Sequence, residues 1–374
     1  MNPARPITVV QLLPALESGG VERSTLEIAQ ALVEAGHRAL VVSAGGRLVA
    51  RLEALGARHV ALDIGRKSPL VLRHVRALRA LLAAERADIV HARSRLPAWI
   101  GRLALRGMAD AARPRWVTTV HGLNSPSRYS AVMASGERVV CVSPTVRAHV
   151  LRHYPRTDPA RLVVIERGID PVLFPRAPLP DRAARAWAAA QHPALGGSGP
   201  LLLLPGRGTR LKGHADALAL LAGLRGQGVD ARLWLPGARE PGRAAYIGEL
   251  ELEARARGVA EAIAITAPTD AIARAYAASD LVLQLSRKPE AFGRTVIEAL
   301  GVGRPVLAWD HGGVGDVLRA LQPAGAVRTF DADALLARAQ ALLSTPPPMP
   351  ASIPHTLRAM QDATLAVYRA LVPA

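Results

Sequence analysis

Two glutamates, Glu290 and Glu298, stand eight positions apart on either side of Gly293. Apolar residues recur at helical spacing after Phe292, which predicts a helix that contains Glu298 and leaves Glu290 in the preceding loop. The first amides of such a helix lack an internal hydrogen-bond partner and lie at the positive end of its dipole, so they suit a phosphate group. The spacing therefore predicts a site in which carboxylates bind hydroxyl groups on each side of a phosphate.

A second candidate is the loop 205–214, which follows four consecutive leucines. The leucine run is typical of a buried strand, and the glycines after it let a diphosphate approach the backbone. Arg207 and Lys212 place two cations at the carboxyl end of this strand, where α/β folds bind ligands. Leu211 stands where a dinucleotide-binding fingerprint has its third glycine, and no Gly-Lys-Ser/Thr follows, so neither common phosphate motif applies. The loop predicts paired cations for a diphosphate.

Lysine is rare in this chain, because only Lys67, Lys212 and Lys288 occur among 47 basic residues. Arginine has replaced lysine wherever charge alone suffices, so a remaining lysine is a candidate for a position that needs a compact charge. Lys212 lies in the loop described above. For Lys288, a solvated position and a place in the site are both open.

These segments resemble the E-x7-E and G-R-x4-K-G motifs of the retaining family-4 glycosyltransferases of the GT-B fold. The resemblance implies that Glu290 contacts the donor sugar and Glu298 the nucleotide ribose, while Arg207 and Lys212 hold the donor diphosphate and stabilise the leaving group. An isolated E-x7-E could equally be a solvated loop residue and a helix-surface charge, since glutamate is common on helices. The residues expected to bind the donor are Gly19, Gly20, Gly206, Phe292, Gly293, Arg294, Thr295 and Glu298.

The N-terminal half supplies a further loop between its first predicted strand and helix. It resembles the family's G-G-x-E loop, which implies that Gly19 and Gly20 approach the donor phosphates and that Glu22 begins the helix. The alternative is an ordinary strand-to-helix turn capped by Ser18. His121 ends another strand and matches the family histidine near the donor sugar, although a strand-end histidine can also be structural. The expected catalytic residues are Arg207, Lys212, Glu290 and His121.

Acceptor contacts are expected from Glu22, Arg93 and Ser94. Arg93 and Ser94 follow a predicted strand at 88–91, and a solvated basic loop is the alternative. Asp316 stands where the family's G-G-x-x-E loop has its glutamate, and the shorter side chain leaves that contact open.

Length and composition favour two α/β domains. The 374 residues are 50% hydrophobic and only 3% aromatic, so the cores must consist of Leu, Val, Ile and Ala, as in parallel sheets covered by helices. Apolar runs alternate with helical patterns throughout. We expect the GT-B architecture, two Rossmann-like doubly wound domains facing a cleft: residues 1–172, a linker at 173–199, a donor domain at 200–350, and a C-terminal helix in 351–374, which in such enzymes often crosses back to the first domain.

A single cysteine, Cys141, lies in an apolar run and is expected to be buried rather than nucleophilic. The sequence has no long apolar N-terminal region and no stretch of 18 apolar residues, so we expect a cytoplasmic protein. No aspartate-rich motif stands near the donor loop. Neither a metal nor a cofactor is therefore expected.

Charge is concentrated in the first half. Residues 1–175 contain 25 basic and 13 acidic residues, a net +12 of the total +17. A helix expected over Leu70–Arg86 carries Arg73, Arg76 and Arg79, and a basic amphipathic surface suits an anionic membrane. Solvated arginine is the simpler alternative. Nucleic acid is disfavoured, because RNA-binding aromatic patches, zinc spacings and a helix-turn-helix are absent.

Together these features predict a peripheral enzyme on the inner face of the cytoplasmic membrane. It would move a hexose-type sugar from a UDP- or GDP-sugar to a lipid-linked or lipopolysaccharide-core acceptor with retention, in cell-envelope glycan synthesis. A sugar-nucleotide 2-epimerase and a noncatalytic nucleotide-sugar-binding protein remain as alternatives. The products distinguish them: a new glycoside, an isomerised donor, or neither.

Overall fold

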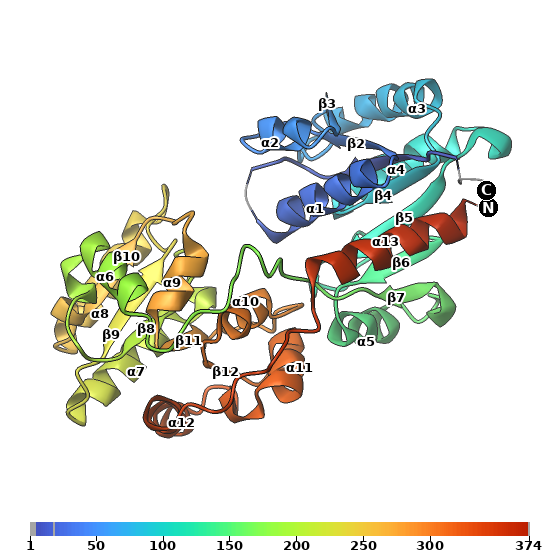
Figure 1. The fold of residues 1–374 in the computed structure, drawn as a ribbon. Helices are drawn as coiled ribbons and strands as arrows, with labels where there is room; N and C mark the ends of the chain where they lie inside the picture. The colour runs from blue at the N-terminus through green and yellow to red at the C-terminus, as the bar shows by residue number, and fades with distance from the viewer. Residues whose placement is uncertain (1–4, 18, 373–374) are drawn as a thin grey trace. The chain divides into compact units, whose positions relative to one another are not determined.

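A computed structural model of the chain describes residues 5–17 and 19–372. The chain forms two compact units, one made of residues 1–167 and 357–374, the other of residues 168–356. Each unit has a single parallel sheet with helices packed on it (Figure 1). The two Rossmann-like, doubly wound halves expected from the sequence are confirmed.

The first unit has a seven-stranded parallel sheet in the order β3-β2-β1-β4-β5-β6-β7. The central strands are fully buried, since their Val, Ile and Leu side chains meet helices on both faces. The strand order reverses between β1 and β4, which pair directly. The strands are β1 (Thr8–Leu12), β2 (Arg38–Ser43), β3 (Arg58–Ala61), β4 (Ile89–Ala92), β5 (Arg115–Val120), β6 (Arg138–Cys141) and β7 (Leu162–Val164).

The last helix of the chain belongs to the first unit. It packs on the first helix, α1, and is drawn in red in Figure 1. Its buried face includes Met360, Leu365 and Tyr368, and Gln361 donates a hydrogen bond to the Glu27 carbonyl at 2.8 Å. The helices of this unit are α1 (Gly20–Glu34), α2 (Val49–Ala54), α3 (His74–Ala84), α4 (Arg95–Arg106), α5 (Pro144–His153) and α13 (Leu357–Leu371), with short 3-10 helices η1 (Pro69–Arg73), η2 (Asp110–Ala112), η3 (Ser130–Ala134) and η4 (Pro159–Arg161).

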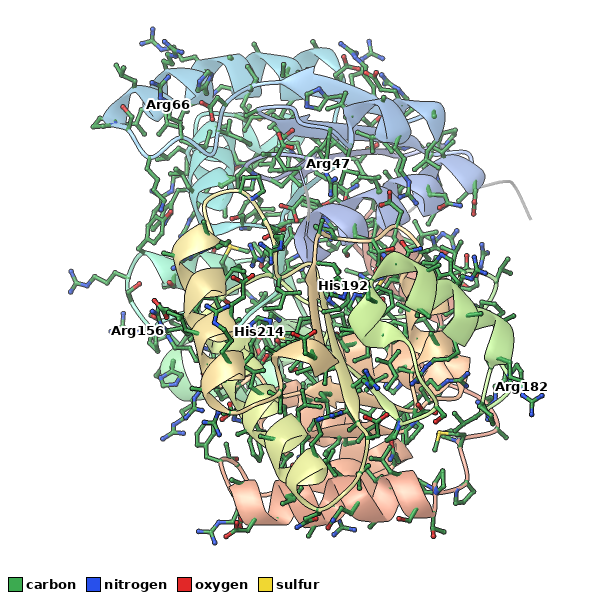
Figure 2. The ribbon with its side chains drawn as sticks, turned by 90° about the vertical axis from the view of Figure 1, so that its left-hand side faces the viewer. Arg47, Arg66, Arg156, Arg182, His192 and His214 are labelled. Carbon is green, nitrogen blue, oxygen red and sulfur yellow. The ribbon has the colours of Figure 1, made fainter. Side chains whose placement is uncertain are left out.

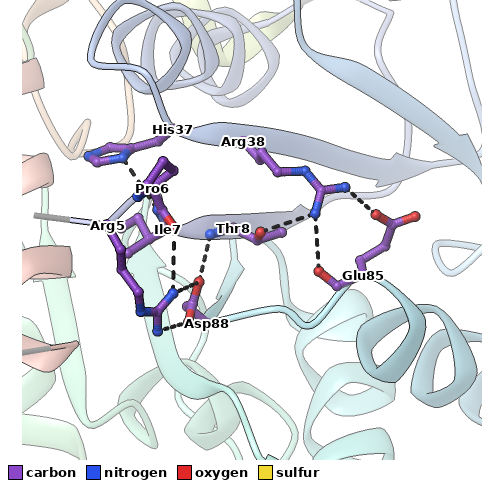
Figure 3. Close-up of polar contacts among 8 residues, drawn as sticks. All are labelled: Arg5, Pro6, Ile7, Thr8, His37, Arg38, Glu85 and Asp88. Atoms are coloured by element: carbon purple, nitrogen blue, oxygen red, sulfur yellow. Dashed lines mark hydrogen bonds and ion pairs between the residues drawn. The ribbon is translucent and has the colours of Figure 1, made fainter. Parts of the chain in front are cut away.

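Ion pairs close the amino-terminal edge of the first sheet (Figure 3). Asp88, just before β4, accepts a hydrogen bond from the Thr8 amide at 2.7 Å and pairs with Arg5 at 2.6 Å. Glu85 pairs with Arg38 and with Arg58. Each carboxylate at this edge therefore has an arginine partner.

The second unit has a six-stranded parallel sheet in the order β10-β9-β8-β11-β12-β13, with the reversal between β8 and β11. Its strands are β8 (Leu201–Leu203), β9 (Arg232–Pro236), β10 (Ile263–Thr266), β11 (Leu281–Gln284), β12 (Val306–Trp309) and β13 (Ala326–Val327). Its helices are α6 (Arg182–Gln191), α7 (His214–Gly226), α8 (Ala244–Ala256), α9 (Ile272–Ala278), α10 (Arg294–Val302), α11 (Gly312–Leu321) and α12 (Ala332–Ser344), with 3-10 helices η5 (Pro193–Leu195), η6 (Arg210–Lys212), η7 (Ala260–Ala262) and η8 (Pro323–Gly325).

The segment 173–199 differs from the expected linker, because it contains α6 and belongs to the second unit. Its proline and alanine content suggested a linker, but alanine is also the strongest helix former. Asp181 caps α6 by accepting a hydrogen bond from the Ala184 amide, and Trp187 packs against Trp234 with ring centroids 5.7 Å apart.

The helix expected over Leu70–Arg86 is also different. Residues 69–73 form η1, and α3 ends at Ala84, before Arg86 adopts a positive φ of 47°. Arg79 does not join the exposed basic face, because its guanidinium donates to the Ala104 carbonyl of α4 at 3.1 Å. Within the part of the chain that the structure describes, no helix has the length and apolar character needed to cross a bilayer.

Candidate functional site

The two donor motifs meet at the carboxyl edge of the second sheet. β8 and β11 are neighbours at the point where the strand order reverses, and this is where open α/β sheets bind ligands. The loop after β8 carries Arg207 and Lys212, and the loop after β11 carries Glu290. The sheet thus brings together residues that are 78 positions apart in the chain.

Lys212 and Glu290 form an ion pair, with Nζ and Oε1 2.6 Å apart. Ser286 donates its hydroxyl proton to the same carboxylate oxygen, also at 2.6 Å. Burial alone would raise the pKa of Glu290, but the Lys212 charge and these hydrogen bonds outweigh it and hold the pKa below its ordinary value. The side chains are 30% and 26% exposed, so a ligand can reach both charges. Glu290 is therefore no solvated loop residue.

Two glycines shape the loop after β8. Gly206 has φ of 151° and Gly213 has φ of 78°, both in the region that favours glycine. A Cβ on Gly213 would lie 2.0 Å from the Leu285 carbonyl oxygen, so only glycine lets this loop pack against the end of β11. Arg207, by contrast, is exposed, and its guanidinium has no hydrogen-bond or ion-pair partner among the described residues. Lys212 is thus held by its ion pair, whereas Arg207 is exposed to solvent.

Helix α10 begins at Arg294, two residues later than expected, and ends where Gly303 turns with φ of 88°. Gly293 stands at its cap position, and no side chain caps the helix start, which leaves the amide end open near Arg294 and Thr295. Phe292, just ahead of it, is buried and packs edge-on against His355 with ring centroids 5.6 Å apart.

Glu298 lies inside α10 and is only 6% exposed, so the alternative of a helix-surface charge is wrong. Its Oε2 accepts a hydrogen bond from the Tyr276 hydroxyl at 3.0 Å, and Oε1 lies 3.5 Å from Arg294 Nε. Tyr276 and Ser286 contact these glutamates, and the sequence did not indicate either of them. Their contacts depend on the tertiary fold, so no residue spacing in the sequence indicates them.

In the first unit, the carboxyl edge holds cations in a buried setting. Arg93 follows β4 and is 2% exposed, so it is not part of a solvated loop. Its Nε donates to Gln11 Oε1 at 2.6 Å, and its Nη1 lies 3.3 Å from Ser24 Oγ. Ser94 stands at the cap position of α4 without a side-chain cap bond. Of the two expected acceptor residues, Arg93 is therefore held in the interior of the unit, whereas Ser94 stands at the start of a helix.

His121 follows β5, and its Nδ1 lies 2.6 Å from Arg167 Nη2. Since a guanidinium only donates, Nδ1 must accept and the ring proton sits on Nε2. Burial, followed by the charges of Arg167 and Arg93, lowers the pKa of His121 well below its ordinary value, so the ring is neutral. Its Nε2–H is buried and has no hydrogen-bond partner within residues 5–17 and 19–372, so it is an unsatisfied donor in this structure.

A second histidine joins α13 to the sheet. His91 Nδ1 lies 2.6 Å from the Tyr368 hydroxyl, and its Nε2 lies 2.6 Å from Thr119 Oγ1. His91 lies in β4 two residues before Arg93, and Thr119 lies in β5 two residues before His121. The Tyr368 contact therefore fixes the strand ends that carry these two candidate site residues.

The glycine loop of the first unit opens α1. Gly19 is the cap residue with φ of 141°, and a Cβ on it would lie 2.7 Å from Glu22 Oε2. A Cβ on Gly20 would meet open space, so only Gly19 requires glycine. The Ser18 cap considered from the sequence lies outside the described residues.

Two further residues from the sequence analysis, Asp316 and Cys141, have local surroundings that explain their positions. Asp316 lies in α11 and pairs with Arg319 at 2.7 Å. Cys141 is buried in β6, as expected, and burial raises the pKa of its thiol to about 12.

These features define a two-domain α/β protein with a partly exposed ion pair at the carboxyl edge of its second sheet. A family model described as Glycosyltransferase Family 4 matches residues 18–173, and one described as Glycosyl transferases group 1 matches residues 187–356. Together the matches cover most of the chain, which belongs to the family-4 glycosyltransferases of the GT-B fold.

Individual relatives agree with this assignment. A D-inositol 3-phosphate glycosyltransferase from Jonesia denitrificans is 32% identical over 252 residues, covering 61% of this chain and 56% of that protein; the chain thus spans just over half of this relative. A glycosyltransferase from Rickettsia africae superimposes with a TM-score of 0.86 at 27% identity, over 99% of this chain and 100% of that one. Anabaena HepE, solved with UDP-glucose, shares the fold with a TM-score of 0.77 at 18% identity, over 97% and 100% of the chains.

Proposed function

We propose that this glycosyltransferase moves a hexose-type sugar from a nucleotide diphosphate sugar, such as a UDP- or GDP-sugar, to an acceptor hydroxyl with retention at the anomeric carbon. The observation that carries the proposal is the partly exposed Lys212–Glu290 pair at the strand reversal of the second unit. It offers a cation for phosphate and a carboxylate for sugar hydroxyls in one place, beside an uncapped helix start.

The reaction breaks the bond between the anomeric carbon and the diphosphate oxygen, so negative charge develops on the departing diphosphate. Lys212, Arg207 and the amides at Gly293 and Arg294 would stabilise that charge, because fixed donors act most strongly where charge develops. Gly206 would let the diphosphate approach the backbone.

Each glutamate would have its own hydroxyl partners. Glu290 would bind the donor sugar once Lys212 turns from the carboxylate to the diphosphate. Glu298, held by Tyr276, would bind the ribose, with Phe292 and Thr295 completing this part of the pocket. In the first unit, Gly19 and Gly20 would approach the donor phosphates, and the neutral His121 would donate its Nε2–H to the donor sugar.

For the acceptor we propose a lipid-linked or lipopolysaccharide-core glycan, with Glu22, Arg93 and Ser94 on the acceptor side. The support is the net +12 of residues 1–175, which favours an anionic membrane over a neutral soluble acceptor. The enzyme would then act peripherally at the inner face of the cytoplasmic membrane, in cell-envelope synthesis.

The test is a screen of UDP-, GDP- and ADP-sugars for thermal stabilisation and donor hydrolysis, followed by analysis of products with extracted lipid-linked and lipopolysaccharide acceptors. A new α-configured glycoside from an α-linked donor supports the proposal. An isomerised donor would instead identify a 2-epimerase. Donor binding with neither product, across the acceptors supplied, would favour a nucleotide-sugar-binding protein.

A further inference from the structure

An exposed apolar turn interrupts the basic surface of the first unit. In η1, Leu70 is 63% exposed and Leu72 is 55% exposed, while Val71 between them is only 6% exposed. Two large aliphatic side chains on one short turn are costly in water. We call this segment, residues 66–76, the leucine–arginine edge.

The leucines are held outward by a well-formed turn. Pro69 occupies the first position of η1, and Ser68 Oγ accepts a hydrogen bond from the Leu70 amide at 3.3 Å. Val71 anchors the turn by inserting into the unit, and the Val71 amide donates to the Ser68 carbonyl at 3.0 Å. Because successive residues of a 3-10 turn point in different directions, burying Val71 exposes its two neighbours.

Basic side chains flank the leucines along the chain, and no acidic residue stands between them. The sequence has no aspartate or glutamate between Asp63 and Glu85. Arg79 turns inward to α4, whereas four cations of the edge are exposed: Arg66, Lys67, Arg73 and Arg76. Figure 2 shows Arg66 at the rim of the first unit.

We propose that the leucine–arginine edge inserts into an anionic lipid bilayer. Leu70 and Leu72 enter the boundary between headgroups and acyl chains, and the four cations bind the lipid phosphates around them. A nucleic acid would use the charges and leave the leucines in water. A second copy of the same edge would place like charges against each other. A bilayer is the partner that accommodates both the leucines and the cations. Its binding does not depend on the proposed transfer reaction.

The contributions of the cations and of the leucines to membrane binding respond differently to salt. Attraction between the cations and lipid phosphates is screened as ionic strength rises, while the burial of leucine is not. On sedimentation with phosphatidylglycerol-containing vesicles, Leu70→Ser with Leu72→Ser should lower the partition coefficient by about tenfold for each leucine, at low and at high salt. Replacing Arg66, Lys67, Arg73 and Arg76 by Ser should lower it strongly at low salt and little at high salt. The control Leu252→Ser removes an equally exposed leucine (62%) from α8 of the second unit and should change nothing.

A labelling experiment tests insertion directly. Cys141 is buried and is the single cysteine of the chain, so Leu70→Cys can be labelled with an environment-sensitive fluorophore at one position. We expect a blue shift with anionic vesicles, none with pure phosphatidylcholine vesicles, and none for labelled Leu252→Cys with either. An unshifted Leu70 label on anionic vesicles, equal binding of the double leucine variant, self-association of the wild type through this edge, or tighter binding to nucleic acid than to vesicles would each overturn the proposal. Donor hydrolysis by the double leucine variant should match the wild type, which separates a failure here from a failure of the proposed reaction.

Discussion

The carboxyl edges of the two sheets hold positive charge in different environments. In the second unit, Lys212 faces a carboxylate, and both side chains are partly exposed. In the first unit, Arg93 is buried and its nearest hydrogen-bond partners, Gln11 and Ser24, are neutral. An exposed ion pair can exchange its carboxylate for a phosphate at small cost. A buried guanidinium that donates hydrogen bonds to fixed side chains has little freedom to move. The second edge is thus built for exchange with a ligand and the first for fixed geometry.

Removing the exchangeable cation should have the largest effect. Lys212→Ala should reduce turnover by about 30- to 150-fold, or about 2–3 kcal/mol, because a charge-assisted bond to the diphosphate is lost in the transition state. Arg207→Ala should behave similarly, and both proteins should remain folded. The control is Arg210→Ala in the same turn, since Arg210 pairs at the surface with Glu249. Wild-type turnover of both variants at saturating donor would remove these residues from the site.

The fixed edge should respond to pH through its buried histidines. Burial lowers the pKa of His91 and His121 well below the ordinary 6.5, so below pH 6.5 the unfolded chain binds protons that the folded unit does not. Stability should therefore fall as pH decreases from 6.5, by about 1.4 kcal/mol per pH unit for each histidine. In the second unit, His214 does the same down to about pH 4.

Hydrogen exchange of each unit between pH 7 and 5, corrected for intrinsic rates, measures this difference. The first unit should lose protection more steeply than the second, because burial also lowers the pKa of His37 and His149 in the first unit. Equal slopes would show that burial of the two histidines is relieved by local opening of the first unit, and the contrast between fixed and exchangeable edges would not hold.

Within the exchangeable edge, the glutamates should separate by role. Glu298→Ala should weaken binding of the free nucleotide diphosphate by about tenfold, the scale of a buried hydrogen bond to a charged group. Glu290→Ala should spare that binding and impair sugar transfer. Tyr276→Phe, which removes the hydroxyl bonded to Glu298, should give a smaller loss than Glu298→Ala. Calorimetry distinguishes these outcomes, and an equal loss of nucleotide affinity in both glutamate variants would contradict the assignment.

The smallest effect is expected at the amino edge of the first sheet. Arg5→Ser breaks the pair with Asp88, but Arg5 is largely exposed, and such surface pairs contribute about 0.5 kcal/mol. Asp88 keeps its bond from the Thr8 amide. Chemical denaturation should show a change in the free energy of unfolding near the limit of measurement. A loss above about 2 kcal/mol would mean that ion pairs at this edge contribute far more than surface pairs normally do.

Much of this arrangement could be predicted from the sequence, because its signals are local. The leucine run, the glycines and the E-x7-E spacing predicted strand β8, its loop and helix α10. Short edge strands such as β3 and β13 were missed, since their few, partly exposed residues carry no clear pattern. Burial could not be predicted for Arg93 either, because the same residues suit a solvated loop until strands distant in sequence enclose them. The contacts of Tyr276, Ser286 and Tyr368 depend on the fold in the same way.

The discontinuity of the first unit has a consequence for biosynthesis. Residues 168–356 form a continuous stretch that can fold as soon as it has left the ribosome. The unit that begins earlier in the chain must wait, because Tyr368 of its last helix is fully buried against His91 and arrives only after the whole second unit has been translated. During that interval we expect the nascent chain to expose the apolar surface on which α13 later packs. The half of the protein that is synthesised first should therefore be the half that most needs a chaperone.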